Sequence, residues 1–90
     1  MIYSVLVMKD AEEDIAALKR SELYAYGRVM KLVGELQEHP RTGTGKPEAL
    51  RYRPGLWSRR ITRKHRLVYM IEDDEVRVLV LSARGHYGDK

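Results

Sequence analysis

Residues 56–71 read LWSRRITRKHRLVYMI, and this stretch decides the fold. It contains two runs of strand length, Leu56 to Thr62 and Arg66 to Ile71, that are rich in β-branched, aromatic and apolar residues. Only Arg63-Lys64-His65 separates them, and consecutive strands joined by so short a turn pair antiparallel. The stretch therefore predicts a β-hairpin within an antiparallel sheet.

Three further segments are expected to extend this sheet. Ile2 to Met8 is an apolar, β-branched run, and Leu50 to Arg53 has the length of a short strand before a turn at Pro54-Gly55. The acidic residues 72–75 predict another turn. Val76 to Leu81 alternates Val and Leu with one arginine, which predicts the last and most buried strand.

Two helices are predicted between the first strand and the hairpin. Asp10 with Glu13 makes a capping-box pattern, so we expect a short helix from Ala11 to Lys19. Ser21 is a candidate cap for a second helix, which His39-Pro40 ends. Its apolar residues share one helical stripe: Leu23, Tyr26, Met30, Val33 and Leu36.

The expected order of elements is β-α-α-β-β-β-β. Ninety residues allow one modest core, so we expect a single domain over residues 1–90. The fold class is α+β, with two N-terminal helices packed on one face of a twisted, mainly antiparallel sheet.

Charge is distributed unevenly along the chain. Residues 41–69 hold nine Lys or Arg and one acid, Glu48, whereas the segments before and after this block are acidic. A basic surface attracts phosphate backbones, and a single carboxylate among the cations weakens that attraction. The pattern is explained if the carboxylate does chemistry on what the arginines bind.

Composition excludes several classes of protein. The chain has no cysteine, which excludes disulfides, thiolate metal sites and a Cys nucleophile and fits the cytoplasm. No apolar run approaches the roughly 20 residues that span a bilayer. The first residues are too short and lack the basic start of a signal peptide.

Strand alternation indicates which side chains share a face. Arg60 shares one face of its strand with Ser58 and Thr62, and alternation likewise assigns Arg66 to one face of the next strand. Two arginines are therefore expected on the face that the helices leave open. A carboxylate, a histidine and a phosphate-binding arginine are sufficient for RNA cleavage without a metal. Glu48 and His86 are the candidates for the proton acceptor and the proton donor.

Four motifs in fixed order resemble one family. They are Gly45 to Leu50, Gly55 to Thr62, His65 to Tyr69, and His86-Tyr87. Together they resemble the YoeB/Txe branch of the RelE toxin superfamily. The resemblance implies a RelE-like, microbial-RNase-like fold and an endoribonuclease that enters the ribosomal A site, cuts mRNA and inhibits translation without metal or other cofactor.

The resemblance also implies roles for individual residues. Glu48 is the expected general base, Arg66 the ligand of the transition-state phosphate and His86 the general acid. Tyr87 orients the substrate or the active-site residues. Arg51 stands where the family commonly has lysine and is expected to contact phosphate, with a planar fork in place of a point donor.

The remaining cations are expected to contact RNA or the ribosome: Lys46, Arg53, Arg59, Arg60, Arg63 and Lys64. The resemblance implies a cognate antitoxin of the YefM/Phd type, operator DNA bound only through the antitoxin complex, and a possible homodimer. No membrane partner is expected. His65 is interpreted as structural or RNA-facing, and Trp57 and Tyr69 as core residues.

Two other functions remain open from the residues alone. A basic module that binds RNA or DNA without cleaving it is the first, since Glu48 is equally suited to a surface ion pair with Arg51 or Lys46. A nuclease acting on free RNA is the second. Loss of cleavage on removal of Glu48 separates catalysis from binding, and cutting without ribosomes marks the general nuclease.

Overall fold

A computed structural model describes residues 1–51 and 53–85 of the chain. Its sheet has five strands in the order β1-β5-β4-β3-β2. The strands are β1 (Ser4–Val7), β2 (Glu48–Ala49), β3 (Leu56–Arg60), β4 (Arg66–Glu72) and β5 (Arg77–Ser82), and a 3-10 turn, η1 (Asp73–Glu75), joins the last two. The predicted element order and α+β class are therefore confirmed.

The predicted hairpin is the pair β3–β4, in antiparallel register with Arg60 opposite Arg66. β4 also pairs antiparallel with β5, and β2 with β3. β1 is the exception, since it pairs parallel with β5 and places Ser4 beside Arg77. A parallel pair needs a long connection, and here the chain between β1 and β5 contains both helices and the other three strands of the sheet.

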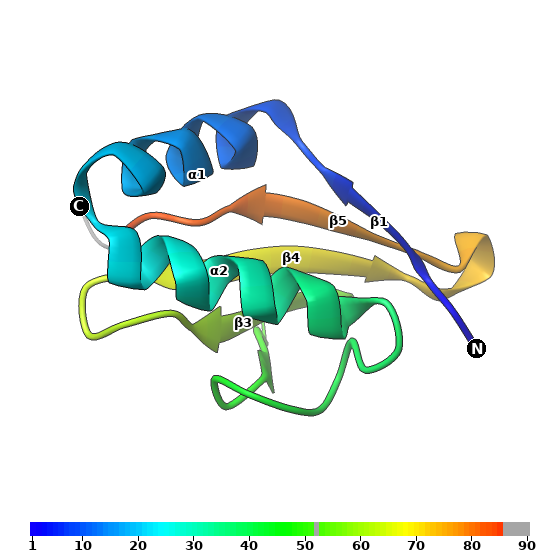
Figure 1. The fold of residues 1–90 in the computed structure, drawn as a ribbon. Coiled ribbons are helices and arrows are strands. Elements are labelled where there is room, and N and C mark those ends of the chain that lie inside the picture. Colours follow the sequence, from blue (N-terminus) through cyan, green and yellow to red (C-terminus); the bar gives the residue numbers. More distant parts are fainter. Residues whose placement is uncertain (52, 86–90) are drawn as a thin grey trace.

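Helices α1 (Lys9–Ser21) and α2 (Leu23–Leu36) form a hairpin that covers one face of the sheet, as Figure 1 shows. The core lies between these layers. β3, β4 and β5 contribute alternate residues to it, among them Tyr69, Val78 and Val80. Leu67 and Ile71 flank Tyr69 on the same face of β4.

The helix boundaries correct two sequence predictions. Asp10 does not cap α1, because the helix already begins at Lys9 and Met8 occupies the cap position. Ser21 does not cap α2. Its hydroxyl donates to the carbonyl of Ala17, 3.0 Å away in its own helix, and Glu22 occupies the cap of α2.

The buried stripe of α2 differs in part from the predicted one, since Leu36 is buried as expected and Tyr26 and Val33 pack against the core. The residues that face the sheet are Ala25, Val29, Leu32 and Leu36. Leu23 is 71% exposed and Met30 46% exposed, although both were expected in the core. Both sets follow helical spacing, and the sequence favoured the bulkier one over a stripe that begins with alanine.

The short strand before the Pro54-Gly55 turn lies earlier than expected. β2 covers Glu48 and Ala49, whereas Leu50 to Arg53 was predicted. Leu50 begins the turn instead: its N–H donates to Leu56 O at 2.8 Å, and Leu56 N–H donates to Arg53 O at 3.1 Å. The shift moves Glu48 from a loop onto the sheet.

Neither of the two helices in the described part of the chain has the length and apolar character required to cross a membrane.

Candidate active site

Three strands bring Glu48, Ser58 and Arg66 together on the face opposite the helices. Glu48 lies opposite Ser58 across the β2–β3 pair, and Ser58 lies opposite Val68 across β3–β4. Arg66 Nη2 donates to Glu48 Oε1 at 3.1 Å. Its Nε and Nη2 donate to Ser58 Oγ at 3.3 and 3.1 Å. The two residues expected to act as base and phosphate ligand are thus in direct contact.

The two side chains of this pair differ in exposure. The Arg66 side chain is 18% exposed and that of Glu48 is 63% exposed. Ser58 is buried and holds the guanidinium from the sheet side. An ion pair this open to water contributes only about 0–1 kcal/mol to stability. The pair presents an oriented guanidinium and an accessible carboxylate to whatever binds this face.

Most of the expected RNA contacts lie on the surface. Arg51 and Arg53 are exposed in the turn after β2, and Lys46 is exposed just before it. Arg60 is exposed at the end of β3. Arg63 and Lys64 are exposed in the β3–β4 turn, where Lys64 Nζ lies 3.7 Å from Glu22 Oε1.

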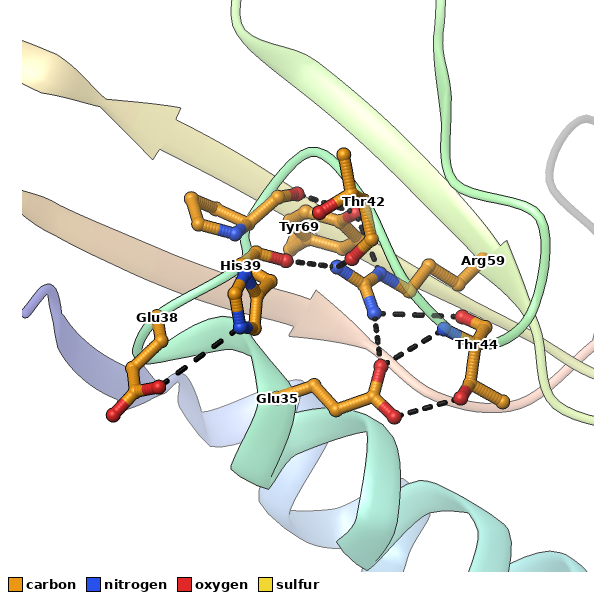
Figure 2. A network of polar contacts seen from close by, with 8 residues as sticks. Glu35, Glu38, His39, Thr42, Thr44, Arg59 and Tyr69 are labelled. Atoms are coloured by element: carbon orange, nitrogen blue, oxygen red, sulfur yellow. Dashed lines mark hydrogen bonds and ion pairs between the residues drawn. The ribbon is translucent and has the colours of Figure 1, made fainter.

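Arg59 corrects the sequence prediction. Its side chain is 0% exposed, which is incompatible with the expected RNA contact. Nε donates to Tyr69 Oη and Nη1 to Glu35 Oε1, each at 2.9 Å. The other donors reach main-chain carbonyls of the loop after α2, as Figure 2 shows: Thr44 at 3.4 Å, Thr42 at 2.8 Å, and His39.

This network fixes the loop that leads into Glu48. Tyr69 Oη donates to Pro40 O at 3.0 Å, and Glu35 accepts from both the N–H and the hydroxyl of Thr44. Burial raises the pKa of Tyr69 even though Arg59 opposes the rise, so its phenol remains a donor. Burial also acts to raise the pKa of Glu35, but the Thr44 hydrogen bonds and Arg59 outweigh it and hold that pKa below its usual value.

Gly45 completes the approach to Glu48. It has a φ of +86°, and a Cβ there would lie 2.7 Å from Arg60 O. Its own carbonyl accepts from Arg60 N–H at 2.7 Å. Only glycine allows this loop to dock against β3, three residues before the candidate base.

His86 and Tyr87 lie outside the described residues, so their predicted roles stay predictions. The described chain ends at Gly85, whose carbonyl accepts from Arg66 N–H at 2.9 Å. His65 is 6% exposed and bonds to Gly85 and Glu22, which makes it structural rather than RNA-facing. Within residues 1–51 and 53–85 no three His, Cys, Asp or Glu side chains gather as a metal site.

Comparison with known proteins identifies the family. The sequence model that matches residues 7–87 describes the YoeB-like toxin of bacterial type II toxin-antitoxin systems. The chain belongs to this family. It is a YoeB-type toxin of a type II toxin–antitoxin system, as the four motifs predicted.

Relatives support the same assignment. The YoeB-type toxin is 46% identical to toxin RelK of Mycobacterium tuberculosis over 79 residues, which covers 87% of this chain and 91% of the relative. The YoeB/ParE toxin from Agrobacterium tumefaciens has a TM-score of 0.85 and 30% identity, covering 93% of this chain and 99% of its own.

Two Staphylococcus aureus structures show assemblies of relatives. One is a YoeB dimer with a TM-score of 0.81, and the other is a YoeB–YefM complex with a TM-score of 0.77. Each is 27% identical to the toxin, covering 97% of this chain and 100% of that chain.

Sequence reasoning missed two residues that build the site of the toxin. Ser58 was placed on the correct face by alternation, but nothing in the sequence indicated that it orients Arg66. Glu35 was not singled out from the sequence. Its spacing from Arg59 carries no local signal, because the contact spans α2 and β3.

Proposed function

We propose that this YoeB-type toxin is an endoribonuclease that cuts mRNA in the ribosomal A site, in the cytoplasm, and so inhibits translation. The observation that carries the proposal is the contact between the Glu48 carboxylate and the Arg66 guanidinium at 3.1 Å on an open sheet face. The contact supports acid–base chemistry on a phosphodiester, because a proton acceptor and a phosphate ligand lie within reach of one scissile bond.

In the proposed reaction Glu48 accepts the proton of the ribose 2′-OH. The freed oxygen attacks phosphorus, the bond to the 5′-oxygen breaks, and the products are a 2′,3′-cyclic phosphate and a 5′-hydroxyl. His86 supplies the proton to the leaving 5′-oxygen, and Tyr87 orients the substrate or the reacting groups. No metal or cofactor takes part.

Arg66 stabilises the charge that builds on the phosphate oxygens. Ser58 Oγ accepts from Nε and Nη2, so the guanidinium keeps its orientation when an RNA phosphate competes with Glu48 for its outer donors. Arg51, exposed beside this face, adds a second guanidinium to the same phosphate or its neighbour.

The exposed cations form a surface for RNA and ribosome. They are Lys46, Arg53, Arg60, Arg63 and Lys64, which flank the Glu48–Arg66 pair before β2, after it, and at the β3–β4 turn. Each phosphate neutralised releases counterions, so affinity for the ribosome falls as salt rises. Arg59 is left out of this set because it is buried.

The proposed partners follow from the assemblies of relatives. The S. aureus YoeB–YefM complex supports a YefM/Phd-type antitoxin for this chain, and the YoeB dimer supports a homodimer. Operator DNA is proposed to be bound only through the antitoxin complex.

The proposal is tested by primer extension on a defined mRNA in a reconstituted translation reaction. Wild type is expected to cut at the A-site codon and to leave free mRNA intact. Glu48→Gln keeps the size of the side chain but removes the base, so cleavage is expected to fall at least about 100-fold. Glu13→Gln, an exposed carboxylate on α1, is the matched control and is expected to cleave like wild type.

Three results contradict the proposal. Equal cleavage by Glu48→Gln and wild type shows that Glu48 is not the base. A folded wild type that binds ribosomes with strong salt dependence but cuts nothing is a binding module instead. Rapid cutting of free mRNA identifies a general nuclease.

A further inference from the structure

His65 is almost completely buried, and its ring makes two different hydrogen bonds. It is 6% exposed, at the turn between β3 and β4. Nδ1 accepts from the N–H of Gly85 at 2.9 Å. Nε2 lies 3.1 Å from both carboxylate oxygens of Glu22, at the junction of the two helices.

These partners determine which ring nitrogen carries the hydrogen. An N–H donor faces Nδ1, so Nδ1 offers its lone pair. Carboxylate oxygens face Nε2, so Nε2 carries the hydrogen and donates it. The two nitrogens therefore have distinct tasks: Nε2 anchors the ring to the helices, and Nδ1 holds the chain at Gly85.

Both the backbone N–H and the backbone carbonyl of Gly85 are hydrogen-bonded. Its N–H is held by His65, and its carbonyl accepts from the N–H of Arg66, the next residue in the chain after His65. One residue pair at the start of β4 thus clamps a single glycine. Two residues earlier, Ala83 N–H donates to Asp14 Oδ2 at 3.0 Å, which ties the same segment to α1.

The clamp adjoins residues that are proposed to carry out the reaction. Gly85 precedes His86, the proposed acid, directly in the chain. Arg66, the other half of the clamp, points its side chain at Glu48. A shift of Gly85 therefore moves the attachment point of the proposed acid relative to the proposed base.

We propose that His65 is a positioning residue for RNA cleavage, which holds Gly85 through Nδ1 so that the chain leaves the clamp in register with Glu48 and Arg66. The inference rests on the proposed function. It assigns to His65 no contact with RNA and no proton transfer.

A packing role alone predicts a different pattern from a positioning role, and two substitutions separate them. In His65→Asn, Oδ1 takes the place of Nδ1 and still accepts from Gly85, but the bond to Glu22 is lost. In His65→Gln, the longer amide places its NH2 near Nε2 and still donates to Glu22, but the acceptor for Gly85 is lost.

The two variants are expected to rank in opposite order for thermal stability and for activity. The bond to Glu22 involves a charged acceptor and is the stronger of the two, so His65→Asn is expected to have the lower Tm. It is also expected to keep kcat for ribosome-dependent cleavage within about 3-fold of wild type, because the clamp that positions the reacting groups is intact. His65→Gln is expected to melt closer to wild type yet lose roughly 10- to 100-fold in kcat with KM unchanged.

Amide hydrogen exchange at Gly85 tests whether the clamp forms, independently of the cleavage assay. Protection is expected in wild type and His65→Asn and is expected to be lost in His65→Gln. Full protection in His65→Gln overturns the clamp. Lost protection with wild-type kcat overturns the positioning role.

If the proposed function is wrong, the results differ from those that contradict the role of His65 alone. Wild type then cuts no mRNA on ribosomes, and the positioning role falls with it, while the exchange data still report whether the clamp exists. A loss of kcat that follows Tm across both variants, with His65→Asn the less active, also overturns the proposal.

Discussion

Arg59 and Arg66 have the same side chain on neighbouring strands but opposite roles. Arg59 points into the helix-covered face, where Glu35, Tyr69 and loop carbonyls surround it. Arg66 points to the open face and meets Glu48. Strand alternation puts Arg59 on the face opposite Ser58 and Arg60, but charge alone assigned it to RNA. A buried guanidinium is not expected from sequence, because its acceptors lie 10 or more residues away and are assembled only by the fold.

Arg59→Met is expected to destabilise the toxin by about 3–5 kcal/mol, because it leaves the Glu35 carboxylate without its buried cation and loop carbonyls without donors. Urea denaturation monitored by circular dichroism measures the change. Arg60→Met is the matched control one residue away, exposed and expected to change stability by no more than about 0.5 kcal/mol. Equal losses in both variants contradict the buried role.

At the scale of elements, turn residues and hydrophobic periodicity were enough to predict the hairpins, but they did not determine which face of a helix is buried. The β3–β4 hairpin was predicted from two strand-like runs and a short turn, and the helix hairpin from its spacing. The buried stripe of α2 was predicted only in part: Leu36 is buried and Tyr26 and Val33 pack against the core, but Leu23 and Met30 are exposed. Overlapping stripes satisfy the same period, and only packing against β3–β5 selects between them. β2 was displaced because turn hydrogen bonds, invisible in the sequence, take the backbone of Leu50.

The corrected stripe of α2 predicts unequal effects of two similar substitutions. Leu32→Ala removes a side chain that is 0% exposed and is expected to cost about 2–5 kcal/mol. Met30→Ala, on the outer side of the same helix, is expected to cost less than about 1 kcal/mol. Thermal denaturation of the two proteins under identical conditions decides. A larger loss for Met30→Ala restores the predicted stripe.

At the scale of the whole molecule, the charge pattern did not identify the site. The basic block indicated an anionic partner, and the motifs identified the family. Neither indicated that one arginine of the block is structural, nor that the first strand pairs parallel with the last. Pairing between segments so distant in the chain depends on how the helix hairpin crosses the sheet, which local patterns do not encode.

Acid is expected to destabilise the whole fold. Hydrogen bonds from His65 and Tyr3 hold the pKa values of Glu22 and Asp73 below their usual values, with Lys64 and Arg41 adding to the effect. For Glu35 burial acts in the opposite direction, but Thr44 and Arg59 outweigh it. A lowered folded-state pKa means that the unfolded chain binds protons first, so this stability is full above the ordinary carboxyl range and is lost as pH falls through the lowered values.

Thermal midpoints measured between about pH 7 and pH 3 test this linkage. Wild type is expected to lose stability progressively below the ordinary Glu pKa of 4.5. Glu35→Gln is expected to be less stable at neutral pH and to fall less steeply, because one of the linked groups no longer titrates. An identical slope in both proteins contradicts the role of Glu35.

The parallel pairing of β1 with β5 has a consequence for synthesis. A ribosome makes β1 before every other strand and β5 after them, yet Ser4 finds its partner only at Arg77. The nascent chain therefore holds an unpaired β1 until the codons of β5 have been read, and β4, which already pairs with β3, gains its second neighbour at the same late moment. A chain whose translation stops before that point has no complete sheet and no clamp beside Arg66. The sheet that carries Glu48 and Arg66 is therefore complete only after β5 has been made.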